Sequence, residues 1–283
     1  MEKDIGREKF KEKKRAELEA LYDAVNEETL MIAEDQEKFS AYLRIQARFN
    51  RYTVTNAILL LHQFPDAQKL KTFEGWKRDG ASVKRGEKSI SILEPYSYTK
   101  ADGSMGNGFR IKKLFDISQT DLKQSPAPFL SGVSSRSLLR ALLEASPVET
   151  EAADTLDHGK DAVYDQEKQK IYIRRMLELD DFFRAAAVSI AEAQLAEQGV
   201  SCGQDELESK AKATAFLLCV KYGIDPERIR VKMPGVAAQI EIKEIKAELS
   251  EIRKTFTSIA DRADESIRVQ RKAGRERGRY EER

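Results

Sequence analysis

The apolar residues in the first part of the chain recur at three- and four-residue steps, which is the spacing of an amphipathic α-helix. Phe39, Tyr42 and Phe49 follow this repeat and predict a helix whose apolar side faces a core. A second helix is predicted over 54–63, because Pro65 pushes the residue before it out of the α region. The stretch before Phe39 is rich in Glu, Lys and Ala, and predicts one or two exposed helices.

The pattern then changes towards strands. A short helix is predicted over 72–80 around Trp76, followed by a strand over 89–93. A polar, glycine-bearing tip at 100–108 and a returning strand at 109–115 complete a predicted hairpin. The first half of the chain therefore reads as helices followed by a small sheet.

The second half predicts a different order of elements. These are a helix over 137–145, hairpin arms at 161–164 and 170–174, long helices over 179–198 and 205–222, and a charged helix from 240 to about 260. Gly223 follows the second long helix, where a helix C-terminus favours glycine. The final dozen residues are rich in Arg and Glu and are expected to be disordered.

These elements predict an α+β protein in which a helical and small-sheet N-terminal domain is followed by a helix, hairpin and helix C-terminal domain and a charged C-terminal helix. A chain of 283 residues is long enough for two domains. The predicted boundaries are an N-terminal helical extension at 1–37, a first domain at 38–125, a Ser/Pro-rich linker at 126–136, a second domain at 137–239, and the helix and tail at 240–283.

Composition excludes several classes of protein. No apolar run approaches the roughly 20 residues of a membrane span, and the N-terminus has no signal-peptide core, so we expect a cytoplasmic protein without membrane contact. Two cysteines and two histidines, far apart, give too few ligands for a structural zinc site, and no cofactor is expected.

Charge is unevenly distributed along the chain. The whole chain carries +1, but residues 38–125 hold 16 basic and 8 acidic side chains and are therefore +8. A basic domain in a neutral protein favours a polyanionic partner, of which nucleic acid is the commonest.

Basic and aromatic side chains in this segment are candidate nucleic-acid contacts. Single strands are bound by a cationic track combined with aromatic rings on which bases stack. The candidates are Arg44, Arg48 and Arg51 along one helix, Lys84, Arg85 and Lys88 on a glycine turn, and the rings of Tyr52, Trp76, Tyr96 and Tyr98. Each residue has a structural alternative: a lone Trp is usually buried, and basic side chains on a helix are usually only solvated. For Asn56 and Gln63, capping and packing are as plausible as hydrogen bonds to DNA.

The same segment resembles the ArdC-type antirestriction proteins of plasmids, conjugative transposons and phages. The matching motifs include Phe49-Asn-Arg-Tyr-Thr-Val-Thr-Asn56, Trp76-x-x-x-Gly80-x-x-Val83-Lys-Arg-Gly-Glu-Lys88 and Leu114-Phe-Asp-Ile-Ser-Gln-Thr120. The resemblance implies an N-terminal domain that binds single-stranded DNA, with Asn56 among its contacts, and a C-terminal domain with a zincin metallopeptidase fold. In the family, such binding is expected to protect incoming single-stranded DNA during conjugation.

The resemblance fails where zinc chemistry is needed. Zincins use His-Glu-x-x-His on one helix to hold Zn²⁺ and activate water, with a third ligand elsewhere. Aligned with the family, this chain has Val188 and Glu192 at the histidine positions, Ser189 at the general base, and Lys212 at or near the third ligand. We therefore expect no catalytic residues, no metal and no enzymatic activity, with an ion pair between Glu192 and Lys212 in the degenerate site.

Two functional hypotheses remain open from the sequence. The first is a non-enzymatic, single-strand-binding protein of a bacterial mobile element with an inactive metallopeptidase-like domain. The alternative is a protein-interaction module, in which the degenerate domain and the apolar face of the helix at 240–256 bind a partner protein or a second copy of the chain.

Overall fold

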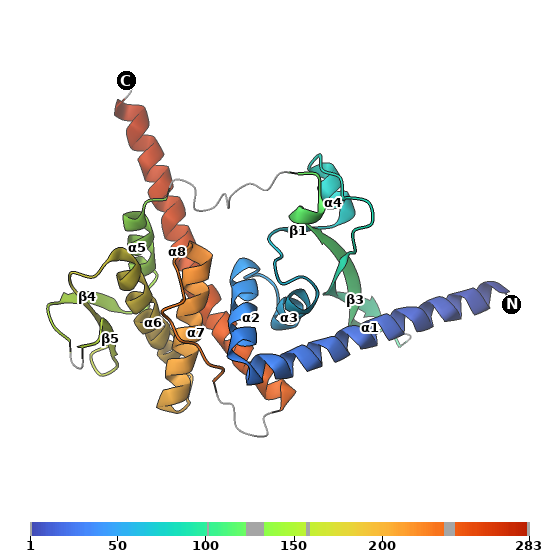
Figure 1. Cartoon of the computed structure of the whole chain (residues 1–283), viewed down its shortest axis with the longest axis horizontal. Helices are drawn as coiled ribbons and strands as arrows, with labels where there is room; N and C mark the ends of the chain where they lie inside the picture. Colours follow the sequence, from blue (N-terminus) through green and yellow to red (C-terminus); the bar gives the residue numbers. More distant parts are fainter. Residues whose placement is uncertain (1, 101, 123–132, 157–158, 235–240, 282–283) are drawn as a thin grey trace. The chain divides into compact units, whose positions relative to one another are not determined.

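The computed structural model describes residues 2–100, 102–122, 133–156, 159–234 and 241–281 (Figure 1). The chain divides into two compact units. The first contains most of residues 2–122, and the second most of residues 133–281, with 46–50 grouped with the second unit and 241–246 with the first. The predicted linker falls largely at 123–132, outside the described residues.

The first unit begins with three helices, α1 (Glu2–Glu34), α2 (Gln36–Arg48) and α3 (Val54–Gln63). Helix α3 spans the residues that the sequence predicts, and the Thr53 side chain caps its first turn by accepting from the Asn56 N–H. The prediction of exposed helices before Phe39 is only partly right. Helix α1 is continuous and packs on α3, with Val25 and Ile32 fully buried.

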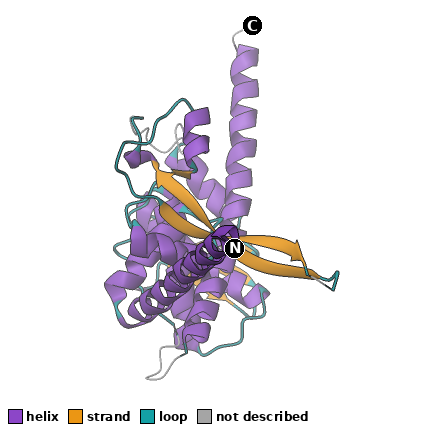
Figure 2. Cartoon of the chain, turned by 90° about the vertical axis from the view of Figure 1, so that its right-hand side faces the viewer, coloured by secondary structure: helices purple, strands orange, loops and turns teal. Residues whose placement is uncertain are grey.

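A small antiparallel sheet completes the first unit. It contains β1 (Leu70–Lys71), β2 (Ile90–Thr99) and β3 (Met105–Asp116) in the order β1-β3-β2, with the short helix α4 (Phe73–Arg78) between β1 and β2. Strands β2 and β3 pair along their whole length, from Ile90 opposite Leu114 to Thr99 opposite Met105. Figure 2 shows these long arms ending in their turn. The predicted tip at 100–108 is therefore too long, because 105–108 belong to β3.

The second unit combines five elements close to the predicted ones with one strand that the sequence pattern did not indicate. They are α5 (Ser135–Glu144), β4 (Glu149–Ala153), β5 (Ala162–Asp165), β6 (Lys170–Arg174), α6 (Leu179–Glu197) and α7 (Gln204–Tyr222). Strand β4 pairs in parallel with β6, whose other edge carries β5. Gly223 ends α7 at φ +73°, as predicted. Helices and two small sheets confirm the α+β class.

The last helix, α8 (Ile242–Glu281), is longer than predicted. The expectation of a disordered final dozen residues is wrong up to Glu281, because runs of Arg and Glu have high helix propensity. Leu249, Ile252 and Phe256 on its apolar face are buried, so the face assigned to a partner in the interaction-module hypothesis is occupied in the folded chain. Within the described ranges, none of the helices has an apolar stretch long enough for a bilayer crossing.

Candidate nucleic-acid interface

Two amide side chains of α3 hold the outer edge of the β2–β3 hairpin. Asn56 accepts from the Leu93 N–H and donates to the Leu93 carbonyl, both at 2.9 Å. Gln63 does the same for Ser91, again at 2.9 Å. Each amide thus replaces one residue of a missing neighbouring strand and satisfies an edge that would otherwise be unpaired. Asn56 therefore has a structural role at this edge, as one of its two interpretations predicts.

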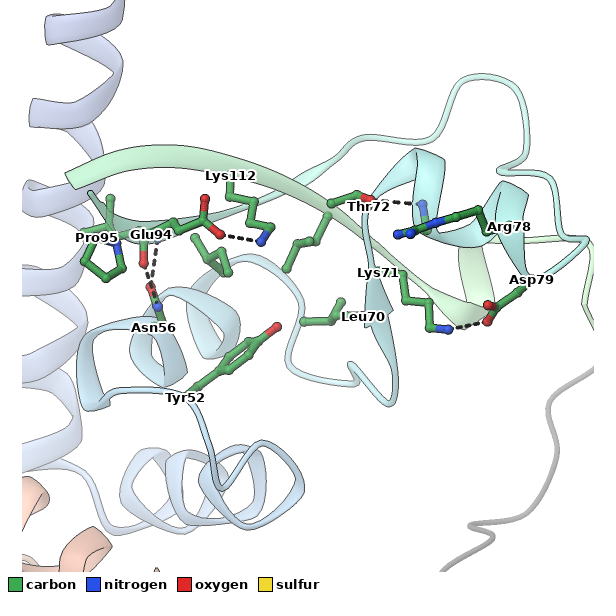
Figure 3. Close-up of a pocket in the computed structure, with 14 residues that line it drawn as sticks. Tyr52, Asn56, Leu70, Lys71, Thr72, Arg78, Asp79, Glu94, Pro95 and Lys112 are labelled. Atoms are coloured by element: carbon green, nitrogen blue, oxygen red, sulfur yellow. Dashed lines mark hydrogen bonds and ion pairs between the residues drawn. The ribbon is translucent and has the colours of Figure 1, made fainter. Parts of the chain in front are cut away.

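A pocket of about 690 Å³ opens between the base of this hairpin and α4. Figure 3 shows the ring of Tyr52 directed into it, with Lys112 on the hairpin side and Lys71 and Arg78 on the α4 side. Its lining residues are Tyr52, Asn56, Leu70, Lys71, Thr72, Gly75, Arg78, Asp79, Ile92, Leu93, Glu94, Pro95, Lys112 and Leu114. An apolar floor with a cationic rim suits a ligand that carries both flat rings and negative charge.

Two carboxylates hold two of these cations in place. Lys71 pairs with Asp79, and Lys112 pairs with Glu94, which also accepts from Arg110. The bond from Lys71 lowers the pKa of the Asp79 carboxyl, and the bonds from Lys112 and Arg110 lower the pKa of the Glu94 carboxyl. Both carboxylates therefore stay ionised at neutral pH.

Arg78 is the third cation of the pocket. It lies exposed at the end of α4 and makes no ion pair with any residue in the described part of the chain. A guanidinium presents a planar fork of donors that matches phosphate geometry. Arg78 is therefore the lining side chain best placed to bind an anionic group.

Trp76 lies in the core and is not a base platform. Its ring is fully buried beside Ala81 and Ile117, and its indole N–H donates to the Phe115 carbonyl at 2.8 Å. The Nζ atom of Lys71 lies 5.6 Å from the ring centroid, within cation–π range. The prediction that Trp76 stacks on DNA bases is thus wrong in this conformation, and its ring instead supports a pocket lysine.

The exposed rings lie farther along the hairpin. Tyr96 is 41% exposed and Tyr98 is 44% exposed, with their ring centroids 5.7 Å apart. They pair with Gly108 and Gly106 of β3. This register could have been found in the sequence, because Tyr96 and Gly108, like Tyr98 and Gly106, lie at equal distances before and after residue 102 in the turn.

The predicted basic turn is exposed but separate from the pocket. Lys84, Arg85 and Lys88 surround Gly86, whose φ of +90° suits glycine alone among common residues. Lys84 donates to the Ser118 carbonyl at 2.9 Å, which connects this turn to the 3₁₀ helix η1 (Ile117–Gln119) that follows β3. None of these residues lines the pocket.

The predicted arginines of the α2 region also lie outside the pocket lining. Arg44 is half-buried on α2, whereas Arg48 and Arg51 are exposed. Of the predicted DNA contacts, only Tyr52 and Asn56 line the pocket, whereas its cations Lys71, Arg78 and Lys112 were not among the candidates. No local pattern marks these three cations, because they come from elements that only the folded chain brings together.

The second unit contains its own cleft, of about 810 Å³, over α6, α7 and β5. Val188, Ser189, Glu192 and Lys212, the four positions that the sequence analysis predicts for a degenerate metal site, all line this cleft. The predicted ion pair between Glu192 and Lys212 is wrong, because Lys212 pairs with Glu208 one turn away on α7. Glu208 lies four residues before Lys212 on the same helix, so the two side chains are already neighbours on its surface.

These side chains do not fit a catalytic zinc ion. Zinc is held by histidine, cysteine or carboxylate groups, whereas Val188 has no ligand atom and the Lys212 ammonium is already paired. In the described ranges, no three His, Cys, Asp or Glu side chains are grouped so that they could hold a metal ion.

Glu192 is the unusual acid of the cleft. Burial raises the pKa of its carboxyl to about 7, with Lys160 opposing the rise, Glu208 adding to it and Lys212 opposing it. No ion pair of Glu192 lies within 4 Å among the residues that the structure describes. Near neutral pH the group is therefore partly protonated.

Comparison with known proteins identifies the first unit. Residues 18–125 match the family model for the N-terminal domain of anti-restriction factor ArdC. Residues 18–125 are therefore similar to an ArdC N-terminal domain. The match begins within α1, in the half that packs on α3, and it includes the pocket and the whole hairpin.

Two crystal structures of the antirestriction ArdC protein from the R388 plasmid are also similar to this chain. The metal-free structure is 14% identical, with a TM-score of 0.48, over 75% of this chain and 85% of that one. The Mn(II)-bound structure is 13% identical, with the same coverage and a TM-score of 0.49. No curated protein matches the sequence.

Proposed function

We propose that this chain is a single-stranded-DNA-binding protein of the antirestriction type, whose ArdC N-terminal domain binds the strand. One observation carries the proposal: residues 38–125, which hold a net charge of +8, lie within the segment 18–125 that matches this domain. Its pocket adds Arg78, which has no ion pair within the described residues, to an apolar floor and the ring of Tyr52.

Binding of this kind is tolerant of sequence and sensitive to salt. Phosphate contacts release counterions, and each contact to a single strand contributes about 0.7 to the slope of log affinity against log salt. The interface has exposed rings and dispersed cations, which suit backbone contacts and stacking. A protein bound in this way would protect the single-stranded DNA of a plasmid or another mobile element from restriction.

We also propose that the second unit has no peptidase activity. A zinc peptidase requires a metal-bound water and a general base beside it. Ser189 is buried and is not a base at neutral pH, and Val188 and Lys212 supply no ligands. The protein should therefore bind DNA equally well with and without a chelator.

A direct test is fluorescence anisotropy of a labelled single strand at several salt concentrations. Arg78→Gln should weaken binding and lower the salt slope by about 0.7, because one phosphate contact is removed. Lys77→Gln is the matched control, since Lys77 is the exposed neighbour on α4 and does not line the pocket. Equal effects of the two variants would remove the pocket from the interface, and no binding by the unmodified protein would refute the proposed function.

A further inference from the structure

The distal half of the β2–β3 hairpin exposes aromatic side chains that serve no core. From Pro95 to Lys100 every residue of this arm is exposed. Tyr96 and Tyr98 are two positions apart and so lie on the same face of the strand. Monomeric proteins rarely display large apolar side chains together unless they bind something.

Each tyrosine ring lies against the backbone of the glycine opposite it. A Cβ atom built on Gly106 would lie 2.7 Å from Tyr98 Cζ, and one built on Gly108 would lie 3.1 Å from Tyr96 Cε1. Only glycine leaves room for the rings in these positions. The strand covers one face of each ring, and the exposure of the rings shows that the other side is open to solvent.

The arrangement provides two separate stacking surfaces. The ring centroids are 5.7 Å apart and the ring planes are inclined by 37°, so one flat molecule cannot lie against both rings. Successive bases of B-DNA are only about 3.4 Å apart along each strand. Two neighbouring bases that used both rings would have to separate, which a single strand allows and an intact duplex resists.

The charges on the same face favour a nucleic acid over an apolar protein segment. Arg110 and Lys112 follow Gly108 on this face of β3, and both bind Glu94, which lies next to Tyr96 on the same face of β2. Lys112 and Glu94 also line the pocket that contains Arg78. Rings and cations thus follow one another along one face of the hairpin.

We propose that Tyr96 and Tyr98, supported by Gly108 and Gly106, form a two-ring platform on which two consecutive bases of a single strand stack. The inference rests on the proposed function and extends it, because it assigns the contacts that distinguish single strands from duplex. Tyrosine laid over glycine also stabilises a sheet, so the test must separate binding from folding.

The experiment compares the affinities of Tyr96→Leu/Tyr98→Leu and of the unmodified chain for two binding substrates (lattices), an oligothymidine and an abasic strand of the same length. A stacked base contributes about 5- to 150-fold to affinity. The double variant should lose at least about tenfold on oligothymidine and much less on the abasic strand. Its salt slope should not change, because no phosphate contact is removed.

Three controls separate folding and general contact from stacking. Tyr96→Phe/Tyr98→Phe keeps both rings and should bind as the unmodified chain does. Phe109→Leu removes an exposed ring from the opposite face of the hairpin and should have no effect. Unchanged Trp76 fluorescence in each variant would show that the first unit remains folded.

The outcomes distinguish this inference from the proposed function. If the double variant loses the same factor on both lattices, or if Phe109→Leu is equally damaging, the platform is overturned while single-strand binding stands. If the unmodified chain binds neither lattice, both proposals fail.

Discussion

Replacing Glu192 by glutamine should stabilise the second unit at pH 8 and leave its stability nearly unchanged at pH 4.5. The amide has the shape of the carboxyl but cannot ionise. The prediction follows from the position of Glu192 in the cleft of the second unit, where it is partly buried and has no ion pair within 4 Å among the described residues.

The magnitude follows from the pKa of Glu192. Burial raises this pKa from 4.5 to about 7, and a pKa difference of one between the folded and unfolded states is worth about 1.4 kcal/mol. A carboxyl whose pKa is raised by folding contributes stability that is present below pH 4.5 and is lost as the pH rises through 7. The unmodified protein should therefore lose up to about 3 kcal/mol of unfolding free energy over this range, and Glu192→Gln should not lose it.

The assay is urea denaturation at several pH values, with two probes that separate the units. Far-UV circular dichroism follows the helices of both units, whereas the single tryptophan, Trp76, reports only on the first. Glu192→Gln should shift the circular-dichroism transition at pH 8 and leave the fluorescence transition unchanged.

Glu208→Gln is the matched control within the same cleft. Glu208 is half exposed, and its bond to Lys212 lowers the pKa of its carboxyl, so its charge favours folding above its unfolded pKa. Its replacement should give no gain at pH 8. If Glu192→Gln gives no gain at pH 8 either, or the same gain at pH 4.5 as at pH 8, Glu192 is not a desolvated acid and the reasoning is refuted.

Three further predictions test other parts of the molecule. Lys210→Met should lower the unfolding free energy of the second unit, measured by urea denaturation, by about 3–5 kcal/mol. The buried Lys210 ammonium is bonded to three glutamates of α7 and α8, which would lose their counter-charge. A decrease below about 1 kcal/mol would contradict this reasoning. Asn56→Ala should lower the unfolding free energy followed by Trp76 fluorescence by about 2 kcal/mol, since two backbone groups of Leu93 lose their partner, and an unchanged transition would argue against the edge-capping role. Lys84→Glu combined with Arg85→Glu should weaken single-strand binding in anisotropy titrations and flatten its salt dependence, whereas unchanged affinity would remove the turn from the interface.

Local patterns were sufficient to predict most of the helices. The bounds of α3 follow from its apolar repeat and from the proline beyond its end, and Gly223 marks the end of α7. Strands that depend on distant partners were harder. Strand β4 pairs in parallel with β6, and no local turn signals this pairing. The sequence pattern assigns Gly106 and Gly108 to a turn, whereas in the structure they belong to β3 and make room for the rings of Tyr98 and Tyr96.

The site was predicted less completely because its contacts are tertiary. Trp76 has a large aromatic ring on which a base could stack, yet this ring is buried in the core, next to Lys71. The alignment placed Glu192 and Lys212 in one cleft correctly, but it did not reveal that Lys212 already had Glu208 as a partner on its own helix. Competition between neighbouring side chains, which an alignment does not contain, decided that Lys212 pairs with Glu208 and not with Glu192.

Competition for a preformed complex tests the central claim most directly. The protein is saturated with a labelled single strand, and unlabelled single strand or duplex of the same length and composition is added at moderate salt, with and without a chelator. The unlabelled single strand should displace the label at far lower concentration than the duplex does, and the chelator should change nothing. Equal displacement by the duplex, or loss of binding in the chelator, would contradict it.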